Sequence, residues 1–258
     1  MSEDTASSAR PDRIVTAAVL LIGNEILSGR TKDANLGYIA QRCTELGIRL
    51  IEARVVADDE AAIVEAVNAL RARVNYLFTT GGIGPTHDDI TADCIAKAVG
   101  RPLIEHPEAR ALLDAHYGDK INPARLRMAR TPEGAALIEN PVSTAPGFRI
   151  ENVHVLAGIP TIMQAMFESL APGLVGGAPL LSRALEVDLP ESVIAGVLTD
   201  AQAAFAETLD IGSYPFARGG GFGVSVVLRS TDGDTLQRGL DTVANGLRGL
   251  GGTVEERV

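Results

Sequence analysis

The first hundred residues alternate between apolar runs and amphipathic segments. A near-continuous apolar run at 14–22 predicts a buried strand, and the spacing of apolar residues at 35–46 predicts a helix that ends before Gly47. Strands separated by helices of this length predict an α/β fold, with a mostly parallel sheet that helices cover on both faces. The further elements predicted in this region are a strand at 48–56, a helix at 60–73, a strand at 74–80 and a helix at 90–99.

The pattern becomes less regular after residue 102, and the loop at 140–147 is a candidate flap over a binding site. Helices are predicted near 108–117 and 123–129, a strand at 153–157 and an apolar helix reaching about residue 170. Turn-forming residues at 172–179 predict a boundary, after which a small second domain follows. Its predicted order is strand 184–189, helix 192–205, strand 208–214, glycine loop 219–223, strand 224–229 and helix 235–250. We therefore expect a disordered leader at 1–12, a main domain at 13–178 and an α+β domain at 183–258.

Charge and cysteine content narrow the classes of function. The chain has 258 residues, 46% of them hydrophobic, and a net charge of −10, which argues against binding the phosphate backbone of nucleic acids. Residues 183–258 hold six Arg or Lys against eleven Asp or Glu, a net charge of −5, so the glycine-rich segment 218–223 is interpreted as a hairpin connection. Cys43 and Cys94 lie in apolar helical contexts, as core residues in a reducing compartment do. With no membrane-spanning apolar stretch, we expect a cytoplasmic protein that binds neither membranes nor nucleic acids.

The segment 76–91 carries the most specific chemical signal, because a buried strand runs into a glycine-rich loop and then an acidic helix start. The loop backbone and the helix N-terminus supply N–H groups that attract anions, whereas Asp88 and Asp89 repel them. A divalent cation between carboxylate and phosphate would reconcile the two, which indicates metal-assisted phosphate or pyrophosphate chemistry. The segment has neither the ending of a Walker loop nor the third glycine of a dinucleotide fingerprint. The alternative is a tight turn in which Asp88 or Asp89 caps the next helix.

Further acidic residues follow the first two predicted strands. Glu25 and Asp33 lie after the first strand, where they could complete a cation site or bind ribose or ring hydroxyls. Asp58 and Asp59 lie after the second strand, and for them metal binding and helix capping are both open. Capping is also the alternative for Asp33. His87 is expected to be an exposed loop residue outside the catalytic set.

The motifs at 23–29, 33–35, Asp58 and 79–91, in this order, resemble the molybdopterin-binding domain family that includes MogA, MoaB and the N-terminal part of CinA. The glycine loop with its Asp-Asp-Ile-Thr ending looks closest to the CinA branch. The resemblance covers about residues 13–174, and 183–258 looks like the small KH-like segment of CinA-type proteins. It implies a three-layer α/β/α domain, a homo-oligomer (dimer or trimer), and a pterin or adenine-nucleotide pyrophosphate as ligand. The chain stops before the deamidase domain of full-length CinA proteins, so deamidation is not predicted.

In the CinA branch the resemblance implies metal-dependent hydrolysis of ADP-ribose to AMP and ribose 5-phosphate, which is our leading hypothesis. In the MogA branch it implies adenylylation of molybdopterin or metal insertion, and non-catalytic binding of a pterin or nucleotide is the third hypothesis. The family's two key carboxylates correspond to Asp58 and Asp89, and a divalent cation (Mg²⁺, Co²⁺ or Mn²⁺) is expected at Asp33, Asp58, Asp88 and Asp89. The predicted ligand-binding residues are Glu25, Ser28, Asn35, Gly81, Gly82, Gly84, Pro85, Thr86, Gly158 and Pro160. A Pro-Gly-x-Pro segment of many members corresponds to 157–160, where Ala157 replaces the first proline.

Overall fold

The structure, a computed structural model, describes residues 14–218 and 221–257. The chain forms two compact units, the second of which begins at Ala178, and each unit has its own sheet and hydrophobic core. The expected leader at 1–12 lies outside the described residues, as do Gly219 and Gly220 of the predicted glycine loop.

The N-terminal unit is built on a six-stranded sheet with the strand order β2-β1-β3-β8-β7-β6. Strands β2, β1, β3 and β8 run parallel, whereas β7 and β6 are antiparallel to their neighbours. The mostly parallel sheet is therefore confirmed, but one edge is mixed, because β7 returns into β8 through a short turn in which Glu151 has a φ of 50°. The strands are β1 Val15–Ile22, β2 Ile48–Val56, β3 Tyr76–Thr80, β6 Ala136–Ile138, β7 Gly147–Ile150 and β8 Val153–Leu156.

Helices cover both faces of this sheet, as the sequence predicts. Helices α3 (Glu60–Arg71) and α4 (Thr91–Val99) pack on one face, and α2 (Asn35–Glu45) and α7 (Pro160–Leu170) pack on the other. Consecutive residues of β1 alternate between the two cores, since Leu20 belongs to the first and Leu21 to the second. Both faces of β1 are buried, which explains the continuous apolar run in the sequence.

The two cysteines are free and buried, one in each core of this unit. Burial raises the pKa of the Cys43 thiol to about 12 and the pKa of Cys94 to about 11, so both stay protonated at neutral pH. Their predicted role as small core residues is confirmed.

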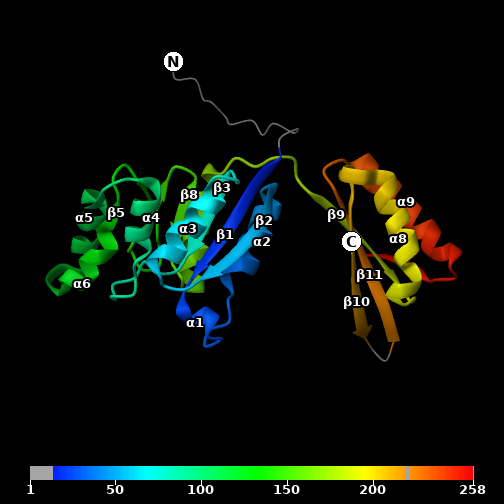
Figure 1. The fold of residues 1–258 in the computed structure, drawn as a ribbon, viewed down its shortest axis with the longest axis horizontal. Helices are drawn as coiled ribbons and strands as arrows, with labels where there is room; N and C mark the ends of the chain where they lie inside the picture. The colour runs from blue at the N-terminus through cyan, green and yellow to red at the C-terminus, as the bar shows by residue number, and fades with distance from the viewer. Residues whose placement is uncertain (1–13, 219–220, 258) are drawn as a thin grey trace, which may run out of the picture. The chain divides into compact units, whose positions relative to one another are not determined.

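A group of short elements lies beside α4 (Figure 1). Strands β4 (Leu103–Glu105) and β5 (Arg130–Pro132) form a two-stranded sheet with α5 (Pro107–Tyr117) and α6 (Pro123–Leu126) nearby. The predicted helix at 108–117 is confirmed, whereas the one at 123–129 ends early in a 3-10 turn that leads into β5. A further short helix, α1 (Asn24–Leu27), lies at the end of β1 in Figure 1 and was not predicted. The candidate flap at 140–147 contains a turn in which Asn140 accepts from the backbone of Val142 and Ser143.

The C-terminal unit is an antiparallel α+β domain with the strand order β10-β11-β9-β12. Helices α8 (Glu191–Phe205) and α9 (Gly233–Gly249) share one core with the sheet. The predicted order of helices and strands is present, with the addition of β12, which has a single apolar residue and gives no strand pattern. The strands are β9 Leu181–Val187, β10 Asp210–Arg218, β11 Gly221–Ser230 and β12 Val254–Arg257.

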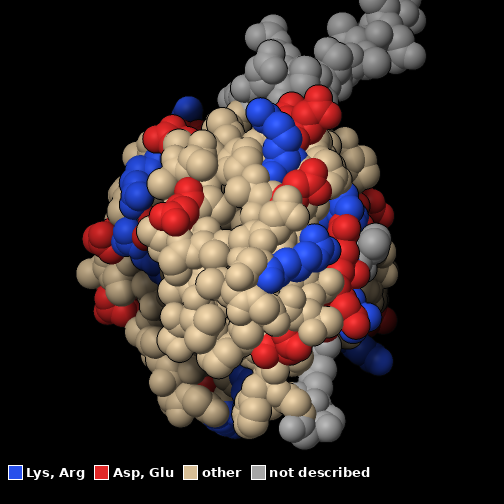
Figure 2. Space-filling model, turned by 90° about the vertical axis from the view of Figure 1, so that its right-hand side faces the viewer, with Lys and Arg blue, Asp and Glu red and all other residues tan. Residues whose placement is uncertain are grey.

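On the face of the molecule seen in Figure 2, Lys and Arg side chains are scattered among Asp and Glu and do not gather into one basic area. Within the ranges that the structure describes, no helix combines the length and the apolar character needed to span a membrane.

Candidate functional site

The glycine loop begins where the backbones of three strand ends meet. Gly81 follows β3 with a φ of 101°, and a Cβ there would lie 2.1 Å from the carbonyl oxygen of Ile22 at the end of β1. A Cβ on Gly158, after β8, would lie 3.2 Å from the Cα of Gly81. These approaches leave no room for a side chain at Gly81 and little at Gly158. Both lie at the carboxyl edge, by which we mean the side of the sheet where its parallel strands end.

The next residues of the loop present free backbone donors. Gly82 has a φ of 67°, and a Cβ there would lie 2.2 Å from Oγ1 of the buried Thr91, whose hydroxyl donates to the Gly81 carbonyl at 2.9 Å. The loop is thereby folded onto the first turn of α4. Among the described residues, the N–H groups of Gly82, Ile83 and Gly84 have no hydrogen-bond acceptor. Three consecutive free N–H groups beside a helix N-terminus form a site suited to an anion.

Asp88 and Asp89 bind within the loop and do not cap α4. The Thr86 hydroxyl lies 2.6 Å from carboxylate oxygens of both residues, and the Thr86 N–H donates to Oδ2 of Asp89 at 2.8 Å. The hydrogen bond from Thr86 lowers the pKa of Asp88 below its usual value, so Asp88 is ionised at neutral pH. Helix α4 begins without a side-chain cap, so the alternative reading, in which an aspartate serves as its N-cap, is wrong. His87 is 97% exposed, as expected.

Asp58 and Asp59 have different roles. Asp59 caps α3 by accepting from the N–H of Ala62 at 2.9 Å. Asp58 accepts from the N–H of Asn24 at 2.8 Å and so joins the end of β2 to the loop after β1. In that loop a Cβ on Gly23 would lie 2.5 Å from Oε1 of Glu25, which places the Glu25 carboxylate against bare backbone. Asp58 and Glu25 therefore occupy the carboxyl edge beside β1, while Asp59 is structural.

Asp33 serves as a helix cap, and Asn35 reaches the glycine loop region. Both carboxylate oxygens of Asp33 accept backbone N–H groups at the start of α2, from Asn35 at 3.1 Å and Leu36 at 3.0 Å. The buried side chain of Asn35 donates to the carbonyl of Gly158 at 2.8 Å. Because Gly158 packs on Gly81, this bond joins the loops after β1 and β8 to the glycine loop.

Within the described ranges, the remaining predicted ligand residues, Ser28, Pro85 and Pro160, make no hydrogen bond that links them to the free N–H groups. The Ser28 hydroxyl donates to the Glu25 carbonyl at 3.3 Å, and Pro160 is the exposed first residue of α7. Pro85 is exposed between Gly84 and Thr86. No hydrogen bond among the described residues joins these three to the free N–H groups of the loop.

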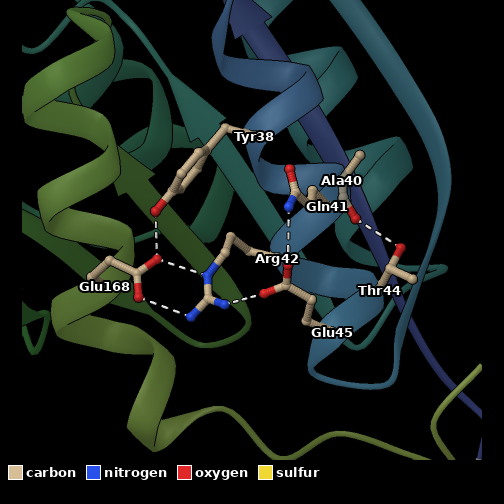
Figure 3. A network of polar contacts seen from close by, with 7 residues as sticks. All are labelled: Tyr38, Ala40, Gln41, Arg42, Thr44, Glu45 and Glu168. Atoms are coloured by element: carbon tan, nitrogen blue, oxygen red, sulfur yellow. Dashed lines mark hydrogen bonds and ion pairs between the residues drawn. The ribbon is translucent and has the colours of Figure 1, made fainter.

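A polar network holds α2 against α7, the two helices whose N-termini carry Asn35 and Pro160. Figure 3 shows Glu168 of α7 between Tyr38 and Arg42 of α2, with Arg42 also contacting Glu45. Arg42 binds Glu168 through Nε at 2.7 Å and Nη2 at 2.9 Å. Burial and the bond to Glu168 raise the pKa of Tyr38 to about 12. The network fixes the relative position of two helices that border the site.

Buried polar atoms without a partner gather around the glycine loop. Across the described part of the chain, five buried side-chain nitrogen or oxygen atoms lack a hydrogen-bond partner. They belong to Asn35, Thr79, Thr80, Arg127 and Arg130. Thr79 and Thr80 immediately precede Gly81. Asn35 is bonded to Gly158, which packs on Gly81. The two arginines line a pocket with Gly82, Gly84 and Asp89. Unpartnered buried polar atoms are rare and costly, so their concentration here makes the glycine loop a candidate ligand site.

Two arginines at the glycine loop, Arg127 and Arg130, were not predicted from the sequence. Arg127 donates to the main-chain carbonyl of Asp89 at 3.2 Å, and Arg130 pairs with Asp93 at 2.9 Å. One signal was present, since residues 120–132 hold four Lys or Arg and no Asp or Glu in a chain of net charge −10. The fold brings two of these basic residues to an otherwise acidic loop.

The carboxylates do not form a complete metal cage. No group of three or more His, Cys, Asp or Glu residues in the described ranges is placed to hold a metal ion. The expected cluster of four aspartates is therefore not assembled, because Asp33 caps α2 and Asp58 binds the loop at Asn24. Asp88 and Asp89 do offer adjacent carboxylates beside free N–H groups. This arrangement fits Mg²⁺, which is commonly held by one or two carboxylates together with phosphate oxygens and water.

Comparisons with known proteins agree with the fold. Residues 18–176 match the family described as "Probable molybdopterin binding domain", and residues 179–250 match "FAD synthase, middle domain". The crystal structure of CinA from Thermoplasma acidophilum, a protein described as having unknown function, is similar with a TM-score of 0.59 and 34% identity. That match covers 62% of this chain and 98% of the other.

Two relatives place the chain more closely. A protein of Aeropyrum pernix is 32% identical over 93% of this chain and 96% of its own length. A CinA-like protein of Desulfosudis oleivorans is 37% identical over 69% of this chain, a stretch that spans 46% of that longer protein. The C-terminal unit was expected to resemble a KH-like segment. The family that it matches is the FAD synthase middle domain. The chain belongs to the molybdopterin-binding domain family, in its CinA-like branch, and carries a FAD synthase middle domain-like unit after it.

Proposed function

We propose that this protein is a divalent-metal-dependent nucleotide pyrophosphatase that hydrolyses ADP-ribose or a closely related dinucleotide. In this reaction a water oxygen bonds to one phosphorus as the bridging P–O bond breaks, and ADP-ribose yields AMP and ribose 5-phosphate. The observation that carries the proposal is the concentration of free N–H groups and unpartnered polar atoms beside Asp88 and Asp89 at the carboxyl edge.

Each group has a role in this reaction. The free N–H groups of Gly82, Ile83 and Gly84 bind non-bridging phosphate oxygens and stabilise the charge that develops on them. Asp58 uses one oxygen to hold the loop at Asn24 and has its second oxygen available to accept a proton from the attacking water. The unpartnered amide oxygen of Asn35 is an acceptor for a ligand N–H or hydroxyl group.

A divalent cation would be held by Asp89 and Asp88 together with phosphate oxygens and water. When bound, it neutralises charge on the phosphate oxygens and lowers the cost of placing an anion beside carboxylates. The descriptions of the two matched families name molybdopterin and FAD, and both names support a ligand that carries phosphate groups. FAD contains an adenylyl pyrophosphate, which is the same group that ADP-ribose presents.

Product analysis tests the proposal. The purified protein is incubated with ADP-ribose in the presence of Mg²⁺, Mn²⁺, Co²⁺ or a chelator, and the products are identified by mass spectrometry. We expect AMP and ribose 5-phosphate with at least one metal and none with the chelator. Tight nucleotide binding without any AMP release would reject hydrolysis and favour a non-catalytic binding protein.

The two neighbouring aspartates after β2 provide a matched pair of variants. We expect Asp58→Asn to reduce kcat by about 100-fold or more, because the amide cannot accept the proton. Asp59→Asn should keep both the N-cap of α3 and nearly full activity, since Asn caps helices about as well as Asp. Equal activity in the two variants would remove Asp58 from the mechanism. Asp89→Asn tests the predicted cation ligand in the same assay, with the exposed Asp119→Asn as its control.

A second candidate function is binding and adenylylation of molybdopterin, which the match to a molybdopterin-binding domain favours. Incubation with molybdopterin and ATP would then yield an adenylylated pterin and pyrophosphate instead of AMP from ADP-ribose. We also propose a homo-oligomer, and sedimentation equilibrium distinguishes a dimer from a trimer.

A further inference from the structure

We propose that Arg127, which lines the same pocket as the glycine loop, binds a phosphate group of the ligand. This inference rests on the proposed use of the loop for a phosphate-bearing ligand and adds a residue that recognises the charge of that ligand. It concerns binding, and it holds whether or not the bound nucleotide is hydrolysed.

Arg127 lies beside the glycine loop. Arg127 and Arg130 line one pocket together with Gly82, Gly84, Asp89 and Phe148. Arg127 lies in the 3-10 turn at 127–129, and Arg130 begins β5. The pocket is therefore lined both by loop residues with free backbone donors and by the two arginines. Its volume of about 10 Å³ has room for about one water molecule, so a phosphate group has to widen it.

Arg127 has a buried hydrogen-bond donor without an acceptor. Its Nη2 donates to the carbonyl of Asp89, but its Nε is buried without an acceptor. No carboxylate among the described residues forms an ion pair with it, whereas Arg130 is paired with Asp93. A half-buried guanidinium with an unsatisfied donor and no counter-charge is costly unless a ligand supplies the acceptor. Arg127 is thus the arginine of this pair that is available to an anion.

The donors of the Arg127 guanidinium complement the oxygens of a phosphate group. A guanidinium presents its donors in a planar fork that matches two oxygens of a phosphate. The adjacent N–H groups of the loop supply further donors. The guanidinium and these N–H groups together offer more donors than one carbonyl oxygen of a ligand could accept. The ligand class that fits is a phosphate or pyrophosphate ester, in preference to an uncharged ring system.

The bond from Arg127 to the Asp89 carbonyl offers a purely structural alternative, in which the arginine only tethers the loop. Arg127→Gln removes the charge and shortens the donor, so the Tm measured beside the affinity shows whether loss of the tether to that carbonyl contributes. Arg127→Lys keeps the charge and loses the fork. Arg101→Gln is the matched control, since Arg101 is exposed, has no ion pair among the described residues and follows the opposite end of α4.

The test is calorimetric titration of each variant with ADP-ribose and with inorganic pyrophosphate, accompanied by thermal unfolding. We expect Arg127→Gln to weaken binding by about 10- to 100-fold at an unchanged Tm, Arg127→Lys to fall between it and wild type, and Arg101→Gln to stay within about twofold. Binding by Arg127→Gln within twofold of wild type, or an equal loss in Arg101→Gln, overturns the inference. If the affinity of Arg127→Gln and Arg127→Lys for both probes falls only as far as the Tm of each variant falls, the tether alone explains the residue and the inference is also overturned.

The outcomes separate this inference from the proposed function. Binding of ADP-ribose that depends on Arg127, without AMP release, supports the inference and rejects hydrolysis. AMP release with wild-type affinity in Arg127→Gln supports hydrolysis and rejects the inference. Wild-type protein that binds neither ADP-ribose nor pyrophosphate overturns both.

Discussion

The two edges of the parallel sheet treat polar groups in opposite ways. At the amino edge, where the parallel strands begin, polar side chains complete hydrogen bonds to neighbouring backbone. Asn152 donates to the carbonyls of Arg71 and Val74, both at 2.9 Å, and Asn75 accepts from the N–H of Thr16 at 2.9 Å. His154, buried beside Tyr76 and Phe78, lies 3.3 Å from the carbonyl of Asn152. These contacts give Asn75, Asn152 and His154 partners within the protein.

The carboxyl edge leaves its polar groups incomplete. The glycine loop has free N–H groups, and the described side chains whose buried polar atoms lack partners all lie on it or beside it. Both edges contain asparagine, and the difference is whether the protein itself supplies the partner. Unmet hydrogen-bonding capacity, more than polarity, distinguishes the proposed site from the structural contacts on the other edge of the same sheet.

The largest expected effect comes from filling the meeting point of strands at the carboxyl edge. Gly81→Ala should lower the free energy of unfolding by about 3 to 4 kcal/mol, because it combines left-handed strain with a Cβ directed at the Ile22 carbonyl. Ligand binding and any turnover should be lost as well. Chemical denaturation and calorimetric titration measure the two effects.

Gly100→Ala is the control for backbone strain alone. Gly100 ends α4 with a φ of 66°, but a Cβ there meets no atom within 4 Å. We expect a loss of about 1 kcal/mol and unchanged ligand binding. If the two variants were equally unstable and both bound ligand, the close packing at Gly81 would not matter.

The contrast between edges also explains which parts of the fold were predictable. Long elements that repeat the apolar pattern were predicted closely, and β2 was predicted at its observed limits, Ile48–Val56. Strands β6 and β7 have only three and four residues, too few for a period to show, so the antiparallel edge was missed. Helix α1 is a single turn, whose stability depends on contacts across the sheet edge.

For the candidate site, the sequence indicated the residues whose chemistry is local. The glycines of the loop, with Asp88 and Asp89, are contiguous, and their pattern was visible. Local spacing did not distinguish Asp58 from Asp59, because capping α3 and joining Asn24 are decided by side-chain direction, and only the family resemblance selected Asp58. Arg127 was not recognised, since its contact with Asp89 joins positions 38 residues apart. Asp33, predicted as a metal ligand, caps a helix, and that role follows from local spacing alone.

The second largest effect is a pH dependence of stability at the amino edge. Burial lowers the pKa of His154 from 6.5 to about 4 in the folded protein. Between these values the unfolded chain binds the proton and the folded chain does not, so the free energy of unfolding falls as the pH falls through this window. The contribution is about 3 kcal/mol when complete, and it levels off below pH 4.

Comparison with His154→Gln isolates this contribution from that of the carboxylates, which also titrate in acid. Urea denaturation at several pH values from 7 down to 4 should give a shallower decline for the variant. Ligand affinity at neutral pH should be the same in both proteins, because His154 lies at the amino edge. Parallel stability curves would show that His154 becomes protonated in the folded state without cost.

The smallest effect tests whether a satisfied asparagine is only structural. Asn152→Ala removes the donor for two backbone carbonyls, so we expect a loss of about 2 kcal/mol in the free energy of unfolding, with no change in ligand affinity. Asn152→Asp should be more destabilising, because it sets carboxylate oxygens against the same carbonyls. Asn68→Ala, on the exposed face of α3, is the control and should change stability by less than about 0.5 kcal/mol. A change in ligand affinity in Asn152→Ala would mean that the amino edge is coupled to the site, and the two edges would then act as one unit.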